Sequence, residues 1–384
     1  MVRRGCKRLM SGFAALAAAG LLAVSSPPPA AAEPDTGGAH DSTRAAMDAA
    51  VRRGVPGVLA GAFEDGRRWT GSAGIADDGT KRAPRPEDRF RAGSITKTFL
   101  ATVVLQLEAE GRLRIGDTVE KWLPGVVRGN GNDGSKITVR QLLNHTSGLY
   151  EYLKDPAPHY GGKEWLAHRY DTWKPEQLAA VAMSHRPDFA PGTKHVYTNT
   201  NYLLTALIVE RASGHSYESE VRRRIIEPLG LRGTTLPGTS SRLPQPSGRA
   251  YKLFPDDLNT VYDVTEYNPS LIRGASDLIT TTGDLDRFCT ALLRGTLLPP
   301  AQLKEMTTTD PVTDGYGLGL FTLTTSCGVK LWGHNGSFAG TETWALSTRD
   351  TRHRLALYLN TDAFLGAGPA SAVIDAEFCP SSTR

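Results

Sequence analysis

Ser94 and Lys97 are the first side chains in the sequence that could act together as a nucleophile and its base. They stand at the start of a stretch whose apolar residues have helical spacing, and residues three apart on a helix share one face. A serine hydroxyl needs an adjacent base, and lysine is such a base only where desolvation or a nearby cation lowers its pKa. A backbone N–H at a helix N-terminus could also bind an oxyanion. Taken alone, Ser-x-x-Lys is common and equally describes a helix cap.

A second pair, Tyr197 and Asn199, precedes a predicted helix at 201–212 and follows a predicted turn at 190–192. Both side chains of such a pair can point into one cleft. Tyrosine offers a second proton-transfer group, and the asparagine amide could hold a substrate amide or orient the lysine. The alternative is a helix lead-in with Asn199 as its cap.

The third group is the run His334-Asn335-Gly336-Ser337, after a predicted strand at 329–332. Gly336 would let a substrate backbone approach the strand edge. His334 could donate a hydrogen bond to the reacting group or to Tyr197. A single histidine beside a strand is, however, more commonly structural than catalytic.

The elements that would position these groups come from both ends of the chain. A flexible lead-in at 33–42 precedes one domain at 43–384. The predicted helices lie at 43–53, 94–110, 201–212, 283–294 and 369–378. The predicted strands lie at 58–63, 68–73, 316–321, 329–332, 341–346 and 354–359. This order predicts an α/β (α+β) fold: an antiparallel sheet from both chain ends, flanked by helices, with a mainly helical inserted subdomain at about 112–275.

Charge and the N-terminal residues limit the partners and the compartment. Four basic residues and no acidic ones precede Glu33, so the 44 Lys and Arg of the chain fall to 40 beyond residue 32, against 40 Asp and Glu. A chain so balanced is not expected to bind nucleic acid. The basic start, the short apolar run and Ala30-Ala31-Ala32 predict a signal peptide at 1–32 and a secreted protein. No later run is long enough to cross a membrane, so we expect no stable membrane anchor.

Three cysteines remain beyond residue 32: Cys289, Cys327 and Cys379. Cys289 lies in a helical pattern, where a buried free thiol is expected. Cys327 and Cys379 flank the last predicted sheet segments and could close a loop. None has metal-ligand spacing, and His-Glu-x-x-His is absent. We therefore expect no metal and no cofactor.

Order and spacing connect the three groups. A Ser-x-x-Lys nucleophile, then Tyr-x-Asn about 100 residues on, then His-x-Gly about 135 further, resembles the serine β-lactamase and penicillin-binding protein family. The chain is most similar to its class C β-lactamase and secreted D-alanyl-D-alanine carboxypeptidase branch, over roughly residues 43–380. The stretches that carry the resemblance are Phe90–Lys97, Ile137–Leu149, Tyr197–Tyr202, Tyr316–Leu320 and Gly333–Gly336.

The resemblance implies a β-lactamase/transpeptidase-like fold and a two-step acyl transfer. Ser94 would attack a carbonyl while Lys97 and Tyr197 move the proton. The N–H groups of Ser94 and Ser337 would hold the oxyanion, and Asn199 would bind the acyl-side amide. The resemblance also implies a Cys327–Cys379 disulfide, and a structural rather than catalytic role for His145.

Two departures from that branch concern the substrate. Asn335 stands where the carboxypeptidases have a threonine, and Phe321-Thr322 where they have a basic residue that clamps the substrate carboxylate. Ser337 could keep part of that function, and Lys330 or Arg273 could substitute for the clamp.

Three functions follow for a monomer acting on small peptides (including peptidoglycan stem peptides), esters or β-lactams. The first expectation is a D-alanyl-D-alanine carboxypeptidase-like hydrolase. The second is a hydrolase of the same fold acting on esters, D-amino-acid amides or β-lactams. The third is a penicillin-binding sensor without useful turnover, against which the retained Tyr197 argues.

Overall fold

The computed structural model describes residue 38, residues 40–363 and residues 368–379. The predicted signal peptide at 1–32 and most of the predicted lead-in at 33–42 lie outside these residues. The described residues form one compact unit. Within the part of the chain that is described, no helix is both long and apolar enough to cross a membrane.

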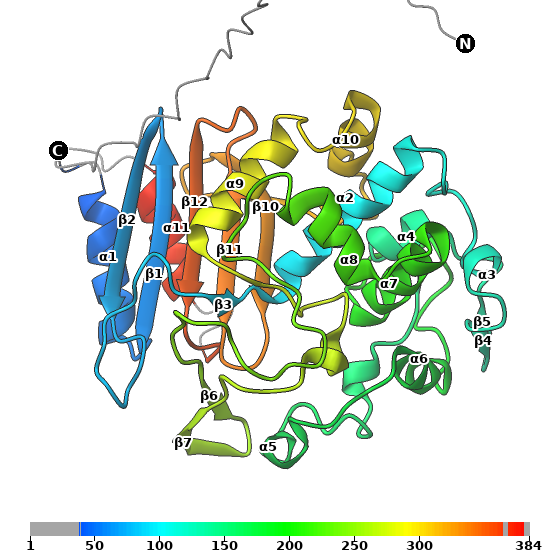
Figure 1. Cartoon of the computed structure of the whole chain (residues 1–384), viewed down its shortest axis with the longest axis horizontal. Helices are drawn as coiled ribbons and strands as arrows, with labels where there is room; N and C mark the ends of the chain where they lie inside the picture. Colours follow the sequence, from blue (N-terminus) through cyan, green and yellow to red (C-terminus); the bar gives the residue numbers. More distant parts are fainter. Residues whose placement is uncertain (1–37, 39, 364–367, 380–384) are drawn as a thin grey trace, which may run out of the picture. The chain divides into compact units, whose positions relative to one another are not determined.

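A six-stranded antiparallel sheet forms the centre of this unit, in the order β2-β1-β12-β11-β10-β9. Its strands come from both ends of the chain, as predicted (Figure 1). They are β1 (Gly57–Glu64), β2 (Arg67–Gly74), β9 (Phe321–Thr324), β10 (Lys330–Ser337), β11 (Glu342–Ser347) and β12 (His353–Leu359). Strands β1 and β12, nearly 300 residues apart in sequence, pair directly from Val58↔Leu359 to Glu64↔His353. The sheet therefore joins the first and last segments of the domain.

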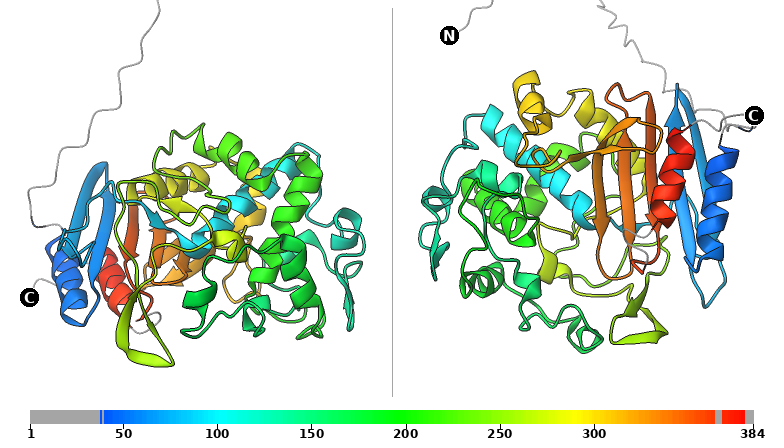
Figure 2. Two further views of the ribbon diagram at one scale, coloured as in Figure 1. Left: turned by 60° about the horizontal axis from the view of Figure 1, so that its bottom comes forward. Right: turned by 180° about the vertical axis from the view of Figure 1, so that it is seen from behind.

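Helices cover both faces of this sheet (Figure 2). On one face, α1 (Asp41–Arg52) and α11 (Pro369–Phe378) pack on each other and on β1, β2 and β12. On the other, α9 (Thr282–Leu293) crosses β1, β11 and β12. Because side chains alternate along a strand, Val58 faces α1 and α11 while Leu59 faces the larger core around α9 and α2.

Helix α2 (Thr96–Ala109) lies between the sheet and a group of mainly helical segments and is buried on all sides. A helix that is apolar all round is one surrounded by protein. The remaining helices are α3 (Val119–Trp122), α4 (Val139–Leu143), α5 (Trp165–His168), α6 (Pro175–Met183), α7 (Asn199–Ser213), α8 (Tyr217–Val221) and α10 (Pro300–Thr307). Three two-stranded pairs complete the fold: β3 (Phe90–Arg91) with β8 (Ile279–Thr280), β4 (Arg128–Gly129) with β5 (Asn132–Asp133), and β6 (Tyr251–Phe254) with β7 (Asp257–Asp263).

Some predicted boundaries are wrong. Residues 316–320 form a loop rather than a strand, because the Thr98 hydroxyl holds the Gly319 carbonyl on α2 at 2.6 Å. Strand β10 continues five residues beyond the predicted end at Trp332, so the His334–Ser337 run is part of a strand. The first helix begins at Asp41, and the predicted start of a helix at Ser94 is a 3₁₀ turn, η1 (Gly93–Ile95), ahead of α2. The final helix has the predicted bounds.

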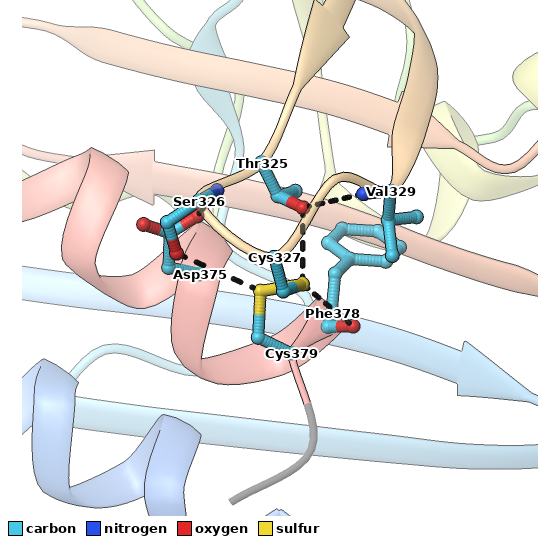
Figure 3. The surroundings of a disulfide bond; sticks show 7 residues. All are labelled: Thr325, Ser326, Cys327, Val329, Asp375, Phe378 and Cys379. Atoms are coloured by element: carbon cyan, nitrogen blue, oxygen red, sulfur yellow. Dashed lines mark hydrogen bonds between the residues drawn. A yellow bond between two sulfur atoms is a disulfide. The ribbon is translucent and has the colours of Figure 1, made fainter.

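Cys327 and Cys379 form the expected disulfide (Figure 3). The bond ties the turn between β9 and β10 to the end of α11. Beside it, the Ser326 N–H donates to the Asp375 carboxylate of α11 at 3.1 Å. Cys289 is a free, half-buried thiol whose pKa burial raises to about 12. Such a thiol is a poor nucleophile.

Candidate active site

The turn that carries Ser94 is held by backbone pairing on one side and by α2 on the other. Strand β3 pairs with β8, and the Ala92 N–H donates to the Leu278 carbonyl at 2.8 Å. The Thr96 hydroxyl donates to the Gly93 carbonyl at 2.7 Å and accepts from the Leu278 N–H at 3.1 Å. Ser94 therefore lies at the N-terminal end of a buried helix, in a turn that is fixed on both sides.

Lys97, one turn along α2, has its ammonium group in contact with three oxygens. Its Nζ lies 3.0 Å from Ser94 Oγ, 2.8 Å from Asn199 Oδ1 and 2.9 Å from the Ala275 carbonyl oxygen. None of the three is charged. The side chain has no solvent exposure, and this desolvation lowers the pKa of Lys97 to about 7, against weaker opposing effects of Glu151 and Asp277. A substantial fraction of Lys97 is therefore a neutral amine at neutral pH.

The neutral amine can act as a base only toward Ser94. It has two N–H groups and one lone pair, and the carbonyl oxygens of Asn199 and Ala275 can only accept hydrogen bonds. These two oxygens take the two N–H groups, which leaves the lone pair for the Ser94 hydroxyl at 3.0 Å. A second hydroxyl, Ser276 Oγ, lies 3.2 Å from Ser94 Oγ. The arrangement can remove the Ser94 proton as the serine attacks.

Asn199 begins helix α7, and both ends of its amide are in use. Its oxygen accepts from Lys97, and its nitrogen donates to Glu151 Oε2 at 3.1 Å. The Asn199 backbone N–H donates to the same carboxylate oxygen at 2.5 Å. Glu151 is buried, and burial raises its pKa. The buried carboxylate fixes which way the amide points, so that Lys97 faces its oxygen. One N–H of the amide is left for a substrate.

Tyr197 lines the same cleft and is 39% exposed, with its ring centre 4.8 Å from Lys97 Nζ. Surrounding protein atoms nevertheless desolvate the phenol and raise its pKa, an effect that a hydrogen bond with Ser94 partly counters. Tyr197 is therefore protonated at neutral pH. Behind it, His145 is fully buried, with ring centres 4.2 Å apart, and accepts from the Thr198 N–H at 3.3 Å. His145 supports the Tyr197 loop and does not reach the cleft.

Strand β10 approaches the Ser94 turn through two glycines. A Cβ on Gly336 would lie 2.0 Å from the Ala92 carbonyl oxygen and 2.9 Å from Ser94 N. A Cβ on Gly93, at φ +55°, would lie 2.6 Å from Ser337 N. Gly336 is thus required by the Ser94 turn, rather than by an approaching substrate as its sequence context suggested. The contact brings the backbones of Ser94 and Ser337 close together, which makes their N–H groups the candidates for an oxyanion site.

His334 does not line the cleft, contrary to its expected contact with the reacting group. It is buried, and its Nε2 accepts from the Tyr316 hydroxyl at 2.9 Å. Its Nδ1 bonds to the Asn335 carbonyl oxygen. Burial lowers the pKa of His334 to about 3, so the ring is neutral. The orientation follows from strand alternation, because His334 and Gly336 point to the buried side of β10 while Asn335 and Ser337 flank the cleft.

The cleft has a volume of about 340 Å³ and two kinds of wall. Its polar side chains are those of Ser94, Tyr197, Asn199, Ser276, Asn335 and Ser337. Its apolar wall is formed by Leu153, Tyr160 and Phe338, and the rings of Tyr160 and Phe338 stack with centres 4.8 Å apart. No basic side chain lines the cleft among the residues that the structure describes.

Neither of the two basic residues considered as a carboxylate clamp reaches the cleft. Lys330 begins β10 at the end opposite Ser337, about 23 Å away at the rise of an extended strand, and covers the Trp332 ring. Arg273 is paired with Glu210 and Glu218, at 2.5 and 2.7 Å. Phe321 packs against His334, with ring centres 5.3 Å apart. The position expected for the clamp is therefore apolar.

The apolar wall of Leu153, Tyr160 and Phe338 was not found from the sequence. Neither were three polar residues that support the site: Glu151, Ser276 and Tyr316. Each acts through a partner far along the chain, Glu151 through Asn199, Ser276 through Ser94 and Tyr316 through His334. Tyr316 lies in the Tyr316–Leu320 stretch already noted, which gave one signal. Glu151 follows the Ile137–Leu149 stretch by two residues. Ser276 has no local signal.

The fold is that of a family of serine hydrolases, and in this chain Ser94 lies in the turn ahead of α2 with Lys97 three residues along. The model of the family described as Beta-lactamase matches residues 40–377, and the chain belongs to this family. Members of the family include amidases, esterases and β-lactamases.

Solved structures and curated proteins agree with this assignment. A D-stereospecific amidohydrolase from Streptomyces sp. is 51% identical, with a TM-score of 0.83 over 88% of this chain and 98% of that one. The D-amino acid amidase from Ochrobactrum anthropi SV3 is 26% identical, with a TM-score of 0.76 over the same shares. Penicillin-binding protein 4* of Bacillus subtilis is 28% identical over 75% of this chain. The chain spans about half to two thirds of the length of the first curated relatives that it matches.

Proposed function

We propose that the protein hydrolyses amides, and the corresponding esters, of D-amino acids with apolar side chains, and that it does not require a substrate carboxylate. The observation that carries the proposal is the composition of the cleft. A wall of Leu153, Tyr160 and Phe338 faces Ser94, and none of the described side chains that line the cleft is basic. An enzyme that selects a free C-terminal carboxylate needs a cation to hold it. This cleft instead suits an apolar acyl group and an uncharged leaving group.

The comparisons support the same substrate class. The two structural relatives with the highest TM-scores reported above are a D-stereospecific amidohydrolase and a D-amino acid amidase. The alignment with the first relative covers 98% of that relative's chain, at 51% identity. The preference for D-amino acids is carried over from these relatives, whereas the apolar acyl site comes from the cleft itself. We therefore favour the amidase over the D-alanyl-D-alanine carboxypeptidase that the sequence first suggested.

In the acylation step, Lys97 is proposed as the resting base. Ser94 Oγ attacks the amide carbonyl carbon as its proton passes to the Lys97 amine. The N–H groups of Ser94 and Ser337 bind the oxyanion. Tyr197, protonated at rest, then passes a proton to the leaving nitrogen and is reprotonated from Lys97. The C–N bond breaks, ammonia leaves, and the acyl group remains as an ester on Ser94.

In the deacylation step, water attacks the ester carbonyl and loses its proton through Tyr197 to Lys97. The bond between the acyl carbon and Ser94 Oγ breaks, Lys97 returns the proton to Ser94 Oγ, and the free amino acid leaves. Oxyanion donors and the proton shuttle each contribute roughly a hundredfold or more in enzymes of this kind. The same steps with an alcohol as leaving group describe an esterase.

The test is a comparison of substrates at one enzyme concentration: D-phenylalaninamide, L-phenylalaninamide, D-phenylalanine methyl ester, nitrocefin and diacetyl-Lys-D-Ala-D-Ala. We expect kcat/KM to be highest for the D-phenylalanine derivatives and at least 100-fold lower for the peptide. Faster release of D-Ala from the peptide than of ammonia from the amide would overturn the proposal.

Two substitutions test the substrate preference, one in the apolar wall and one at the position expected for the clamp. Tyr160→Ala removes part of the apolar wall and is expected to raise KM for D-phenylalaninamide about tenfold, with a smaller effect on D-alaninamide. Tyr170→Ala is the matched control, since this tyrosine is 49% exposed and does not line the cleft. Phe321→Arg should raise activity on the D-Ala-D-Ala peptide if the missing clamp limits it.

A further inference from the structure

Three metal-ligating side chains gather on the segment that forms one wall of the cleft. One ligand atom each from His159, Glu164 and His168 lie within 4.8 Å of one another. The two imidazole rings are stacked, with centres 3.9 Å apart and planes 10° apart. His159 Nδ1 lies 3.3 Å from Glu164 Oε1. The proposed hydrolysis uses none of these groups.

The local fold explains why these groups meet. Glu164 precedes helix α5 and His168 ends it, so the two are four residues apart on one helical face. Trp165 anchors the helix: it is 2% exposed and contacts the rings of Phe254, Tyr267 and Phe338. The preceding chain turns back at His159, which has a φ of +53°. The turn places His159 over His168.

A fourth side chain orients one of the imidazoles. The Asp171 carboxylate lies 2.8 Å from His168 Nδ1. A proton on Nδ1, donated to Asp171, leaves the Nε2 lone pair of His168 for a metal ion. Metal-bound histidines usually have such a carboxylate or carbonyl partner on the other ring nitrogen. The group therefore has three potential ligands, and the Asp171 carboxylate orients one of them, His168.

We propose that His159, Glu164 and His168 bind a divalent transition-metal ion, with Zn²⁺ as the best match. Two imidazoles and one carboxylate are ligands typical of zinc, with water in the fourth position. Zinc–ligand distances of about 2.0–2.2 Å are reached when each of three ligand atoms within 4.8 Å of one another moves by about 1 Å or less and the stacked imidazoles rotate to turn their in-plane lone pairs toward the ion. The side chains are partly exposed and can make this movement. Ca²⁺ and Mg²⁺, which prefer all-oxygen sites, should not bind.

The position of the site connects it to the cleft. Tyr160 follows His159 directly, lines the cleft and stacks on Phe338. A metal ion held by His159 and α5 would restrain the turn from which Tyr160 projects. The ion would thus be a structural element of the apolar wall and would take no part in the chemistry at Ser94.

The experiment is a calorimetric titration of the purified, chelator-treated protein, carrying no polyhistidine tag, with ZnCl₂, in the absence of any substrate. We expect one Zn²⁺ per chain. His168→Gln and Glu164→Gln should each weaken binding at least 30-fold, and Asp171→Asn about tenfold to 100-fold. His215→Gln and Glu176→Gln are matched controls on exposed residues outside the group and should bind as the wild type does.

Titration with CoCl₂ adds a spectroscopic measurement that does not depend on stability. A visible absorption band of a nitrogen- and oxygen-bound Co²⁺ should appear with the wild type and be absent from His168→Gln. Failure of the wild type to bind Zn²⁺, or equal binding by Glu164→Gln, whose side chain is 70% exposed and not needed for folding, would overturn the site. Because no substrate is present, neither result bears on the proposed amidase activity.

Discussion

Lys97 and Arg273 are two buried or largely buried basic side chains attached to the same short loop. The partners of Lys97 are uncharged, whereas those of Arg273 are carboxylates. Lys97 contacts the loop through the Ala275 carbonyl and has only uncharged partners. Arg273, two residues earlier, is paired with the carboxylates of Glu210 and Glu218. The pKa of Lys97 falls to about 7, whereas the two carboxylates raise the pKa of Arg273 against its desolvation.

The difference shows how burial produces either a base or a structural ion pair. Removing a cation from water favours its neutral form, and a carboxylate in contact restores the charged form. Around Lys97, the carboxylates of Glu151 and Asp277 act from behind neutral groups and only partly oppose desolvation. The immediate neighbours of each side chain therefore decide whether burial yields a reactive amine, as at Lys97, or a fixed ion pair, as at Arg273.

The largest expected effect is that of Ser94→Ala, which removes the group that makes Lys97 useful as a base. We expect covalent labelling by a fluorescent penicillin, and hydrolysis of D-phenylalaninamide, to fall at least 10⁴-fold. Ser276→Ala is the matched control, because its hydroxyl lies 3.2 Å from Ser94 Oγ and is not among the three oxygens that Lys97 Nζ contacts. A loss of about tenfold or less is expected there. Labelling that persisted in Ser94→Ala and vanished in Ser276→Ala would show that Ser276, and not Ser94, is the nucleophile.

Asn199→Asp should give Lys97 the kind of partner that Arg273 has. The new carboxylate contacts the amine directly and also lies against the Glu151 carboxylate, which loses the Asn199 N–H. The negative charge of this pair raises the pKa of Lys97, so less neutral base is present at pH 7. In the wild type, kcat/KM should rise with pH and level off above about 7. In the variant that rise should move about two pH units higher, with a loss of about 100-fold at pH 7 that is largely recovered at pH 9.

Asn199→Ala separates charge from hydrogen bonding in this experiment. It removes the same contact with Lys97 without adding a carboxylate. Its rate should fall while the midpoint of the pH profile stays at or below that of the wild type. A profile that moved upward in the alanine variant as well would show that Lys97 does not set the pH dependence.

Lys97→Met tests the cost of burying the amine through stability. The folded-state pKa of Lys97, about 7, is below its unfolded value of about 10.4. Between these values the unfolded chain binds more protons, so wild-type stability rises with pH across the window. The wild type should therefore gain about 2–3 kcal/mol relative to Lys97→Met between pH 6 and pH 9. Urea unfolding of both proteins at the two pH values measures this difference, and an unchanged difference would contradict the lowered pKa.

The sequence predicted the parts of this site whose signals are local. The apolar pattern placed the first and last helices and the strands β1, β2, β11 and β12 within a few residues, because each of these elements packs at least one face in a core. Ser94 and Lys97 were singled out because Tyr197-x-Asn199 and His334-x-Gly336 follow them in the order and spacing of a known family, since the helical-turn spacing alone is common. The sheet formed by both chain ends followed from the order of the elements.

The errors share one physical cause, which is contact between distant segments. Residues 316–320 look like a strand but are drawn into a loop by a hydrogen bond to α2. His334 was expected to face the reacting group, but the extension of β10 turns it toward Tyr316. Arg273 looked like an available cation because its partners lie 55 and 63 residues away in the sequence. No pattern around position 273 reveals that its guanidinium is already paired with two carboxylates.

The smallest expected effect concerns Arg273 itself. Glu218→Gln removes one of its two carboxylates, at a site where the side chains are 16% and 22% exposed. We expect the free energy of unfolding to fall by about 1–2 kcal/mol, measured by urea unfolding at pH 7. Glu227→Gln is the control, because its pair with Arg222 is more than half exposed and should contribute little.

Activity should change less than threefold in Glu218→Gln, because the loop that contacts Lys97 has other attachments. The Asp277 carboxylate bonds to the Tyr217 hydroxyl and accepts from the Gly274 N–H at 3.1 Å. The Leu278 carbonyl accepts from Ala92, beside the Ser94 turn. These contacts fix Ala275 and Ser276 independently of Arg273. A large fall in kcat with unchanged KM would show instead that the ion pair positions the Lys97 site, and that the two cations act as one unit.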